Sequence, residues 1–231
     1  MQLKANFDHW EEVMKPAGFN NLMDSNALEA ANSAGTLTLP NQIQIWVDFK
    51  NGDKKALSFI YQATVKSLFN YGQKFIPDKE IVADLIQDLF VELWNQRERL
   101  SNTTSIKYFL LKSLRYKIFR YLKRNKDVFI KNGISDDYNF ELVFSHEHKL
   151  IEDGFAEEQK KKLALALTKL SKRQKEAIYL RYYNNLSYPE IASLMLLSEQ
   201  SSYNLISKAL KVLHKHLLHY AYLFFLIYCF C

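Results

Sequence analysis

Apolar residues recur every three or four positions in two separate blocks of the chain, a spacing that predicts amphipathic helices. In the first block, Asp53 is placed to begin a helix with apolar positions at Ala56, Leu57, Ile60, Tyr61, Val65, Leu68 and Phe69. Two more helices are expected over 79–97 and 106–126. The helix over 79–97 carries an acidic and amide face, and the helix over 106–126 alternates basic with aromatic residues.

The second block contains a pattern typical of a helix-turn-helix. Ser187 and Glu190 form an S-x-x-E capping box, and Pro189 falls in the first helical turn, where a missing N–H costs little. Ser198 can cap a second helix over 199–216, with an apolar stripe at Ile206, Ala209, Leu210 and Leu213. A short helix, a tight turn and a longer helix with a polar beginning is the geometry that enters a DNA major groove.

The predicted fold class is all-α, with two small helical domains joined by an acidic linker. Only 6 Gly and 4 Pro occur, which argues against a turn-rich β fold. A further capping box, from Ser171 to Gln174, begins a helix in the second domain. The expected parts are a weakly structured extension, a first domain, a linker with room for one short helix, a helix-turn-helix domain and an apolar tail, over 1–42, 43–126, 127–157, 158–216 and 217–231. A start codon assigned too early would equally account for the extension.

Net charge and the composition of the two termini indicate the type of partner and the cellular compartment. The formal net charge of +6 favours a polyanionic partner. Cys229 and Cys231 are the only cysteines, and the N-terminus lacks the apolar core of a signal peptide, so a cytoplasmic protein is expected. The tail over 217–231 is shorter than the roughly 20 apolar residues that a membrane-spanning helix needs. A terminal helix that packs on the protein or on a partner is the favoured interpretation of this tail, with membrane contact and a frameshifted or otherwise artefactual tail as alternatives.

Signatures of catalysis are absent from the sequence. It contains no P-loop, GxGxxG, G-x-S-x-G or paired CxxC motif. Five histidines lack partners at metal-binding spacing and are expected to be structural or solvated: His146, His148, His214, His216 and His219. Asp84, Asp88 and Glu92 share one helix face, but nothing near them indicates the burial that acid–base catalysis needs. We therefore expect a protein that is not an enzyme, with no cofactor and no metal.

The basic and aromatic helix over 106–126 suits unpaired nucleic acid. Lys and Arg neutralise phosphates while aromatic rings stack on bases, and a single-strand binding surface combines both. An ordinary basic amphipathic helix with a core of aromatic residues is the alternative. Similarly, the acidic face of the preceding helix is expected to be either solvated or a protein-docking site.

Together these segments resemble a sigma factor of the extracytoplasmic-function group, in the compact two-domain form common in Bacteroidetes, over roughly residues 46–217. DLIQDLFVELW, residues 84–94, is similar to the motif that docks on the clamp helices of RNA polymerase. SIKYFLLKSLRYKIFRYLKRNK, residues 105–126, resembles the segment that melts and reads the minus-ten promoter element, and residues 97–105 the loop that holds a flipped base. Residues 167–213 resemble sigma domain 4, which reads the minus-thirty-five element.

The resemblance implies a role for individual residues. Core polymerase binding falls to Asp84, Gln87, Asp88 and Phe90. Minus-ten DNA contacts fall to Ser101, Asn102, Lys107, Tyr108, Lys112, Arg115, Tyr116, Phe119 and Lys123. Minus-thirty-five contacts fall to Arg173, Arg181, Gln200, Ser201, Tyr203, Asn204 and Lys208. The implied partners are core RNA polymerase, through its beta and beta-prime subunits, promoter DNA and an anti-sigma factor, either soluble or membrane-anchored; no small-molecule substrate is implied.

The helix-turn-helix departs from the family pattern. Leu196 stands where the turn usually has Gly, and Ser202 where a buried Val is usual. Asn204 and Leu205 stand where many relatives carry basic residues, so phosphate contact by this helix is expected to be weaker. Two alternatives to a sigma factor therefore stay open: a helix-turn-helix regulator of another type, and a degenerate sigma-like interaction protein. A helical hydrolase using the acidic face is a third, and it would need a metal.

Overall fold

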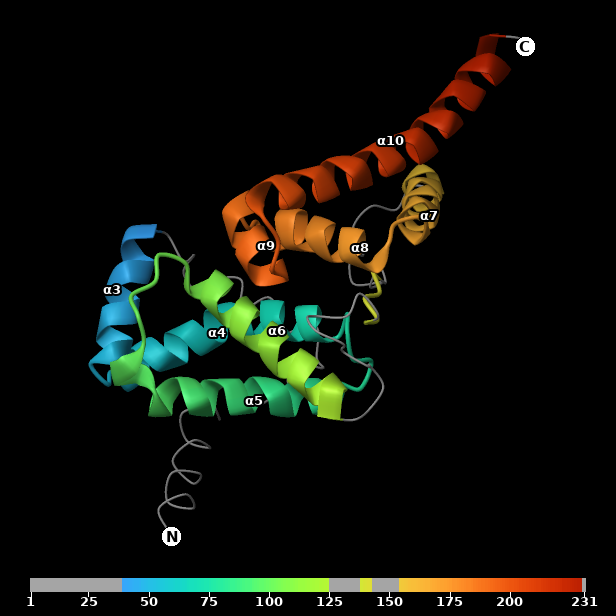
Figure 1. The fold of residues 1–231 in the computed structure, drawn as a ribbon. Helices are drawn as coiled ribbons and strands as arrows, with labels where there is room; N and C mark the ends of the chain where they lie inside the picture. The colour runs from blue at the N-terminus through green and yellow to red at the C-terminus, as the bar shows by residue number, and fades with distance from the viewer. Residues whose placement is uncertain (1–38, 125–137, 143–153, 230–231) are drawn as a thin grey trace. The chain divides into compact units, whose positions relative to one another are not determined.

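The computed structural model describes residues 39–124, 138–142 and 154–229, with side chains over 41–124, 138–142 and 161–216. The chain divides into two compact units, residues 1–125 (unit 1) and 126–231 (unit 2). Every regular element in the described part is helical, which confirms the predicted all-α class (Figure 1). Most of the predicted extension and much of the predicted linker lie outside the described residues.

Unit 1 consists of α3 (Leu39–Lys50), α4 (Lys54–Gly72), α5 (Lys79–Asn95), a 3-10 turn η3 (Arg97–Arg99) and α6 (Ile106–Arg124). Asp53 caps α4 by accepting a hydrogen bond from the Lys55 amide at 2.8 Å. Asp78 caps α5 in the same way through the Glu80 amide at 2.9 Å. The three predicted helices of this block are confirmed, although α5 and α6 each end two residues before the predicted position. The first helix begins inside the predicted extension.

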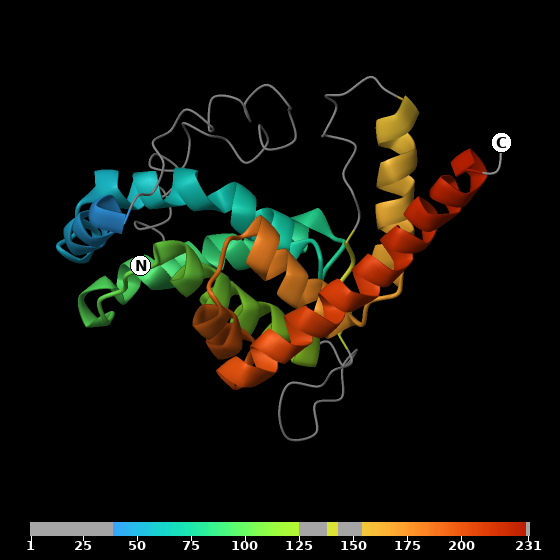
Figure 2. The ribbon, with the colours of Figure 1, turned by 90° about the horizontal axis from the view of Figure 1, so that it is seen from above.

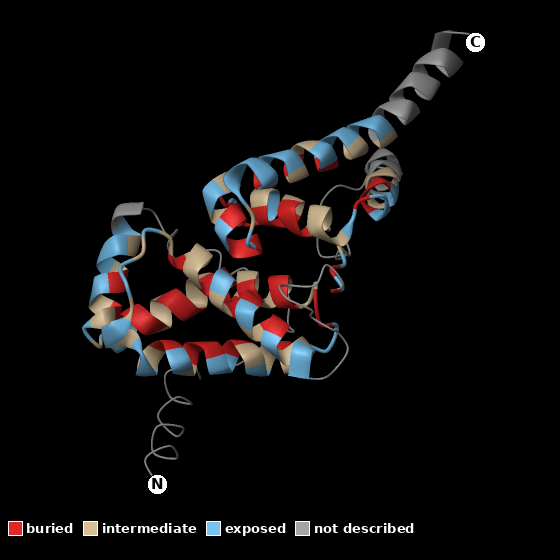
Figure 3. Ribbon diagram, in the orientation of Figure 1, coloured by how far each residue is buried: buried red, intermediate tan, exposed pale blue. Residues whose placement is uncertain are grey.

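The core of unit 1 lies between α4, α5 and α6, which pack on one another, while α3 packs on α4. Figure 3 shows the buried stripes of these helices, and Ile60, Ile86 and Leu110 are fully buried members of them. Gly72 permits the close approach of α4 and α5, because a Cβ there would lie 2.6 Å from Cγ1 of Val82. The 3.6-residue periodicity of the sequence therefore translates directly into one apolar core.

Unit 2 consists of α7 (Gly154–Thr168), α8 (Lys172–Ile178), a π-helical turn η4 (Tyr179–Tyr183), α9 (Tyr188–Met195) and α10 (Glu199–Cys229). The long helix α10 packs on α7, α8 and α9. It continues to Cys229, past the predicted end at residue 216, because no Gly or Pro interrupts the tail (Figure 2). Within the described ranges, no helix combines the length and the apolarity needed to cross a membrane.

Both capping boxes of unit 2 are present as predicted. In the first, the Ser171 hydroxyl accepts from the Gln174 amide at 3.2 Å and the Gln174 side chain accepts from the Ser171 amide at 2.9 Å. In the second, the Ser187 amide donates to the Glu190 carboxylate at 2.8 Å. These caps fix where α8 and α9 begin, and so they position the helix-turn-helix.

A short part of the predicted linker belongs to the core of unit 2. Tyr138 and Phe140, in the described segment 138–142, are each 1% exposed. The Tyr138 hydroxyl donates a hydrogen bond to the Glu176 carboxylate of α8, and the Phe140 ring lies 5.9 Å from that of Tyr179. The prediction of a linker over 127–157 is wrong at these residues. The surrounding acidic residues led to the assignment as linker, although two aromatic residues of the segment are buried. The same prediction also extends into α7, which begins at Gly154.

The turn between α9 and α10 adopts a left-handed backbone at a leucine. Leu196 has φ 55° and ψ 51°, its amide donates to the Ala192 carbonyl, and its side chain is 68% exposed. The turn therefore keeps its left-handed backbone although leucine replaces glycine, and the backbone at Leu196 is strained. A left-handed conformation costs an L-residue roughly 1–2 kcal/mol. Ser202 accommodates its buried position through hydrogen bonds from its hydroxyl to the Glu199 and Tyr188 carbonyls, at 2.8 and 3.2 Å.

Replacing this leucine with glycine should stabilise unit 2. Leu196→Gly relieves the left-handed strain and removes few contacts, so the free energy of unfolding should rise by about 1 kcal/mol. Leu165→Gly is a matched control, because Leu165 is 58% exposed but lies inside α7, where glycine costs about 1 kcal/mol. In thermal unfolding followed by circular dichroism, the midpoint temperature should rise for Leu196→Gly and fall for Leu165→Gly. If both substitutions lowered it, the backbone at Leu196 would not be strained.

Candidate polymerase and nucleic-acid interfaces

The acidic face of α5 is presented to solvent. Asp84, Gln87 and Asp88 are exposed on successive turns, whereas Glu92, the next residue of the same row, accepts a hydrogen bond from Lys117 of α6 at 2.6 Å. The salt bridge neutralises the Glu92 end of the row. The negative charge of this face is therefore concentrated at Asp84 and Asp88, where a basic partner surface can reach it.

Phe90 does not lie on this exposed face. It is fully buried, and its ring packs edge-on against Tyr61 with 5.0 Å between centroids. At 100° per residue, Phe90 points about 200° away from Asp88, toward the core rather than toward a partner. The prediction that Phe90 contacts polymerase is wrong for the chain as it is folded here. The same packing buries Tyr61, and burial raises its pKa to about 12.

The loop before α6 is held from α3. Nε1 of Trp46 donates to the Ser101 carbonyl at 3.0 Å, and Nζ of Lys50 donates to Oδ1 of Asn102 at 3.1 Å. At the end of the loop, the Ile106 amide donates to Oε1 of Gln42 at 3.1 Å. The fixed loop keeps Ser101 and Asn102 exposed.

These loop contacts were not predicted from the sequence, because their donors and acceptors lie more than fifty residues apart. The buried Trp46, near the beginning of the family resemblance, was the one signal that α3 belongs to this site. Its indole N–H requires a partner once the ring is buried, and the loop carbonyl is that partner.

The exposed side of α6 combines cations with an aromatic ring. Lys112, Tyr116 and Lys123 are exposed, and Tyr116 is the most exposed large apolar side chain in the described part, at 71%. Nζ of Lys112 donates to the Tyr108 hydroxyl at 3.3 Å. Lys107 is partly buried, and burial lowers its pKa. The pairing of ring and cation required for contact with unpaired bases is thus present on this face.

Arg115 and Phe119, also predicted to contact minus-ten DNA, lie in the core instead. Arg115 is 4% exposed and Phe119 is 6% exposed, and the Arg115 guanidinium carbon lies 4.4 Å from the centre of the Phe119 ring. The two residues are four positions apart and share the buried face of α6, and the Phe119 ring packs on Phe75. Both predictions are wrong, because these side chains cannot reach DNA from this position.

The first turns of α10 present polar side chains. Gln200, Ser201, Tyr203, Asn204 and Lys208 are all exposed. Nε2 of Gln200 donates to Oδ1 of Asn204 at 3.1 Å, which orders two amides one turn apart. The Ser201 amide donates to the Ser198 hydroxyl at 3.1 Å, so Ser198 caps this helix as predicted.

Arginine side chains near the helix-turn-helix are partly used within unit 2. Arg181 donates to the Leu186 carbonyl at 2.9 Å, and its guanidinium lies 4.9 Å from the centre of the Tyr188 ring. Arg173 and Arg181 are both half-buried. Arg181 is therefore restrained by these two contacts, and only part of its side chain faces solvent.

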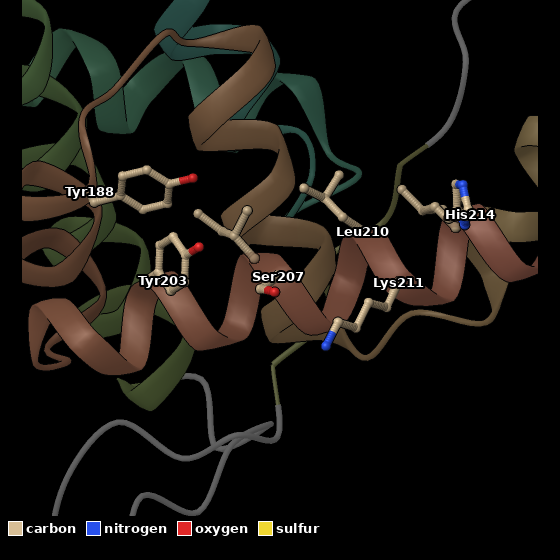
Figure 4. Close-up of a pocket in the computed structure, with 8 residues that line it drawn as sticks. Tyr188, Tyr203, Ser207, Leu210, Lys211 and His214 are labelled. Carbon is tan, nitrogen blue, oxygen red and sulfur yellow. The ribbon is translucent and has the colours of Figure 1, made fainter.

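A hollow of about 550 Å³ lies along the side of α10, next to these polar turns (Figure 4). Tyr188 and Tyr203, whose rings are 5.5 Å apart, close one end of it. The rest of the lining combines apolar with polar residues: Ile206, Leu210 and Leu213 with Ser207, Lys211 and His214. Tyr203 is therefore shared between the polar beginning of α10 and this hollow.

No group of three His, Cys, Asp or Glu side chains in the described ranges is arranged to hold a metal ion. His146, His148 and His219 lie outside the residues whose side chains are described. The described residues form three surfaces that a partner can contact: an acidic helix face, a basic and aromatic helix with its fixed loop, and a polar helix beginning.

Comparison with known proteins gives matches in both units. The family model described as sigma-70 region 2 matches residues 60–128, and that described as sigma-70, region 4 matches residues 160–213. The extracytoplasmic-function RNA polymerase sigma factor SigX of Bacillus subtilis (strain 168) is 22% identical over 166 residues, covering 71% of this chain and 84% of that protein.

Two solved structures are also similar. CnrH in complex with the cytosolic domain of CnrY has a TM-score of 0.51 at 19% identity, with 76% of this chain and 96% of that chain covered. The sigma factor RpoE in complex with the anti-sigma factor NepR from Bartonella quintana has a TM-score of 0.48 at 19% identity, with 71% and 95% covered. At this identity, the likeness to CnrH supports the fold alone.

The two family matches occur in the order expected from the sequence and together cover more than half of the chain. They confirm the prediction of a transcription initiation factor. This chain belongs to the sigma-70 family and is a sigma factor of the extracytoplasmic-function group.

Proposed function

We propose that the acidic face of α5 docks on a basic surface of core RNA polymerase through Asp84, Gln87 and Asp88. These three side chains are exposed on one helix face, whereas the apolar face of α5 is used by the core of unit 1. Complementary charge steers association and fixes the register of an interface. The exposed carboxylates of Asp84 and Asp88 are the single observation that carries this assignment.

The second part of the proposal places minus-ten DNA on α6 and its preceding loop. Ser101 and Asn102 are exposed on a loop that is hydrogen-bonded to α3. Tyr116 supplies an exposed ring between Lys112 and Lys123. Unstacking a base costs a few kcal/mol, which a prepared pocket and a stacking ring offset. Lys107 and Tyr108 complete the set, and Arg115 and Phe119 support it from the core.

The third part places minus-thirty-five DNA on the first turns of α10, through Gln200, Ser201, Tyr203, Asn204 and Lys208. Asn and Gln side chains read base edges, and the Gln200–Asn204 hydrogen bond orders one such pair. Arg173 and Arg181 are proposed to add phosphate contacts with the exposed parts of their side chains. Few cations lie on this surface, so its affinity for DNA should depend less on salt than that of a basic recognition helix.

The proposal extends to setting and partners. A Bacteroidetes-like affiliation, a cytoplasmic location and an anti-sigma factor, soluble or membrane-anchored, are proposed from the family resemblance. The domain limits proposed for the two functions are residues 43–126 and 158–216, with the segment 138–142 added to the second. The structure of CnrH, which is similar in fold to this chain, contains the cytosolic domain of CnrY, and this complex supports the search for such a partner here.

Run-off transcription tests the proposal as a whole. Purified core polymerase and the full chain are incubated with promoter DNA recovered from random sequence by selection with that holoenzyme. Transcripts that require the chain, from a defined start, are the expected result. Promoter binding in the absence of polymerase, with no transcript, would instead support a helix-turn-helix regulator, and no DNA binding at all would support a degenerate interaction protein.

The exposed ring of Tyr116 gives a specific prediction. Tyr116→Ala should weaken binding of holoenzyme to a single-stranded oligonucleotide of the minus-ten non-template strand by about 5- to 150-fold, since stacking on one base contributes roughly 1–3 kcal/mol. Tyr116→Phe keeps the ring and should retain binding. Tyr182→Ala is the matched control, because Tyr182 is an exposed tyrosine of unit 2. Equal affinity of Tyr116→Ala and wild type, by fluorescence anisotropy, would remove Tyr116 from the DNA surface.

A further inference from the structure

The loop before α6 holds Asn102 between two restrained residues. On one side, the Ser101 carbonyl accepts a hydrogen bond from Nε1 of Trp46 at 3.0 Å. On the other side, the Thr103 hydroxyl donates to the Ser105 carbonyl at 3.1 Å and accepts from the Ser105 amide at 3.2 Å. Asn102 itself is exposed. Its backbone is therefore restrained from both sides while the residue stays accessible to a ligand.

The support behind Ser101 is the side chain of Trp46, which is 1% exposed. Its ring lies 5.2 Å from that of Phe49 in α3 and 5.2 Å from that of Phe109 in α6, measured between centroids. A side chain packed between two helices of a dense core has little freedom to move. The Ser101 carbonyl is thus held by the core of unit 1 rather than by another surface group.

Lys50 fixes the side chain of Asn102. Nζ of Lys50 donates to Oδ1 of Asn102 at 3.1 Å. A lysine ammonium carries donors only, so it pairs with the oxygen end of the amide and not with the nitrogen end. The two ends lie on opposite sides of the planar group, so Nδ2 and its two N–H donors are turned away from Lys50. Lys50 and Trp46 are four positions apart, so one face of α3 supports both the backbone and the side chain.

From this geometry we propose that Lys50 is a positioning residue for base selection: it holds the Asn102 amide with its N–H donors toward an unpaired base, so that the loop favours a base with an acceptor at the contacted position. The inference rests on the proposed function, in which this loop and α6 contact the minus-ten element. It adds a residue of α3 to the residues that determine sequence preference, although Lys50 does not itself read the base.

Holding the amide matters because its two ends are opposite in hydrogen-bonding character. An amide that can turn satisfies either a donor or an acceptor on the base, so it discriminates little. A held amide presents a donor only, and a base with its own donor at the contacted position would then leave two donors facing each other. The two pyrimidines differ in this way, since thymine has O4 where cytosine has an amino group, and adenine and guanine differ likewise at C6.

The size of the effect follows from one hydrogen bond. A net contribution of this kind changes binding by about 2- to 10-fold, so Lys50→Met should reduce the preference at one base position by about that factor. Preferences at the other positions should stay unchanged. A direct contact of Lys50 with a phosphate would act differently, because it would weaken binding uniformly across sequences and lower the salt dependence when removed.

The test is competition binding of holoenzyme, followed by fluorescence anisotropy, to single-stranded oligonucleotides of the minus-ten non-template strand of a selected promoter. Each position is replaced in turn by the three other bases. Wild type should show a preference at one position that Asn102→Ala abolishes and Lys50→Met reduces. Lys50→Arg keeps a charged donor and should retain most of that preference. Lys55→Met is the matched control, because Lys55 is an exposed lysine of α4 in the same unit.

Two further variants test whether Lys50 acts through the amide. In the Asn102→Ala background, Lys50→Met should change no preference, because the amide that it positions is gone. Asn102→Asp keeps a partner for Lys50 but presents acceptors only, so the preference at the same position should shift toward a base with a donor there. Thermal unfolding of Lys50→Met should match that of wild type, since the residue lies at the surface of α3.

The possible failures are distinguishable. Wild-type holoenzyme that binds none of the oligonucleotides would contradict the proposed function. A preference that Asn102→Ala abolishes but Lys50→Met leaves intact would overturn the inference alone. Uniform weakening by Lys50→Met, with a lower salt dependence and an unchanged preference, would also overturn it and assign Lys50 to a phosphate instead. A preference at every position that Asn102→Ala does not alter would remove Asn102 from the DNA surface and the inference with it.

Discussion

Reversing one exposed carboxylate, Asp88→Arg, is expected to weaken binding of core polymerase by about 30-fold or more, because losing one partner of an interfacial charge pair costs about 2–5 kcal/mol. The substitution also places a cation against the basic surface that the proposal requires, which adds repulsion. Asp88 is exposed and lies on the opposite side of α5 from the core residues. The fold should therefore survive, and transcription should be lost through failure to form holoenzyme.

The measurement is pull-down of core polymerase on the immobilised chain, at two salt concentrations. Glu98→Arg is the matched control: it makes the same change of charge in the same unit, on a side chain that is 75% exposed and forms a surface pair with Arg97. An exposed pair of this kind contributes little to stability. If Asp88→Arg and Glu98→Arg retain equal amounts of polymerase, the acidic face of α5 is not the docking surface.

The helical part of the fold could be predicted because three signals agreed at each helix. Apolar spacing gave the buried faces of α4, α5 and α6, capping residues such as Asp53 and Ser187 gave the starts, and the family resemblance gave their order. The ends were less certain. Nothing in the sequence after residue 216 stops α10, so the helix expected in the tail is not a separate element but the continuation of α10 to Cys229.

The interfaces could be predicted only in part, because residue type does not state which side of a helix a side chain occupies. Arg115 was expected on the surface from its charge, yet it is flanked at three- and four-residue spacing by Leu111, Ile118 and Phe119, and it is buried with them. Tyr138 and Phe140 were missed for the opposite reason, since the charge of the surrounding segment outweighed two alternating aromatic residues.

Sequence patterns could not predict contacts between segments that lie far apart along the chain. The hydrogen bonds that fix the loop from Ser101 come from α3, and their partners are separated by more than fifty residues. The spacing of apolar residues along a helix does not indicate which distant residues will form such hydrogen bonds. The structure therefore adds to the predicted minus-ten surface a rigid support, Gln42, Trp46 and Lys50, that determines how the loop is presented.

Phe90→Ala is expected to lower the free energy of unfolding of unit 1 by about 3–5 kcal/mol, because it empties a fully buried site in the core. The loss includes the edge-on contact with Tyr61. Small domains are stable by about 5–15 kcal/mol in total, so much of the stability of unit 1 would be removed. All three tryptophans, Trp10, Trp46 and Trp94, lie in residues 1–125, so urea unfolding followed by tryptophan fluorescence reports on this unit selectively.

Phe90→Leu separates packing from polymerase contact. Leucine keeps most of the apolar volume, so its cost should be clearly smaller than that of alanine, and unit 1 should remain folded. Because Phe90 faces the core while Asp84 and Asp88 face solvent, the folded Phe90→Leu variant should bind core polymerase as wild type does. A folded Phe90→Leu variant that binds polymerase as poorly as Asp88→Arg would mean that α5 turns or opens on docking, bringing the phenylalanine of the motif into the interface.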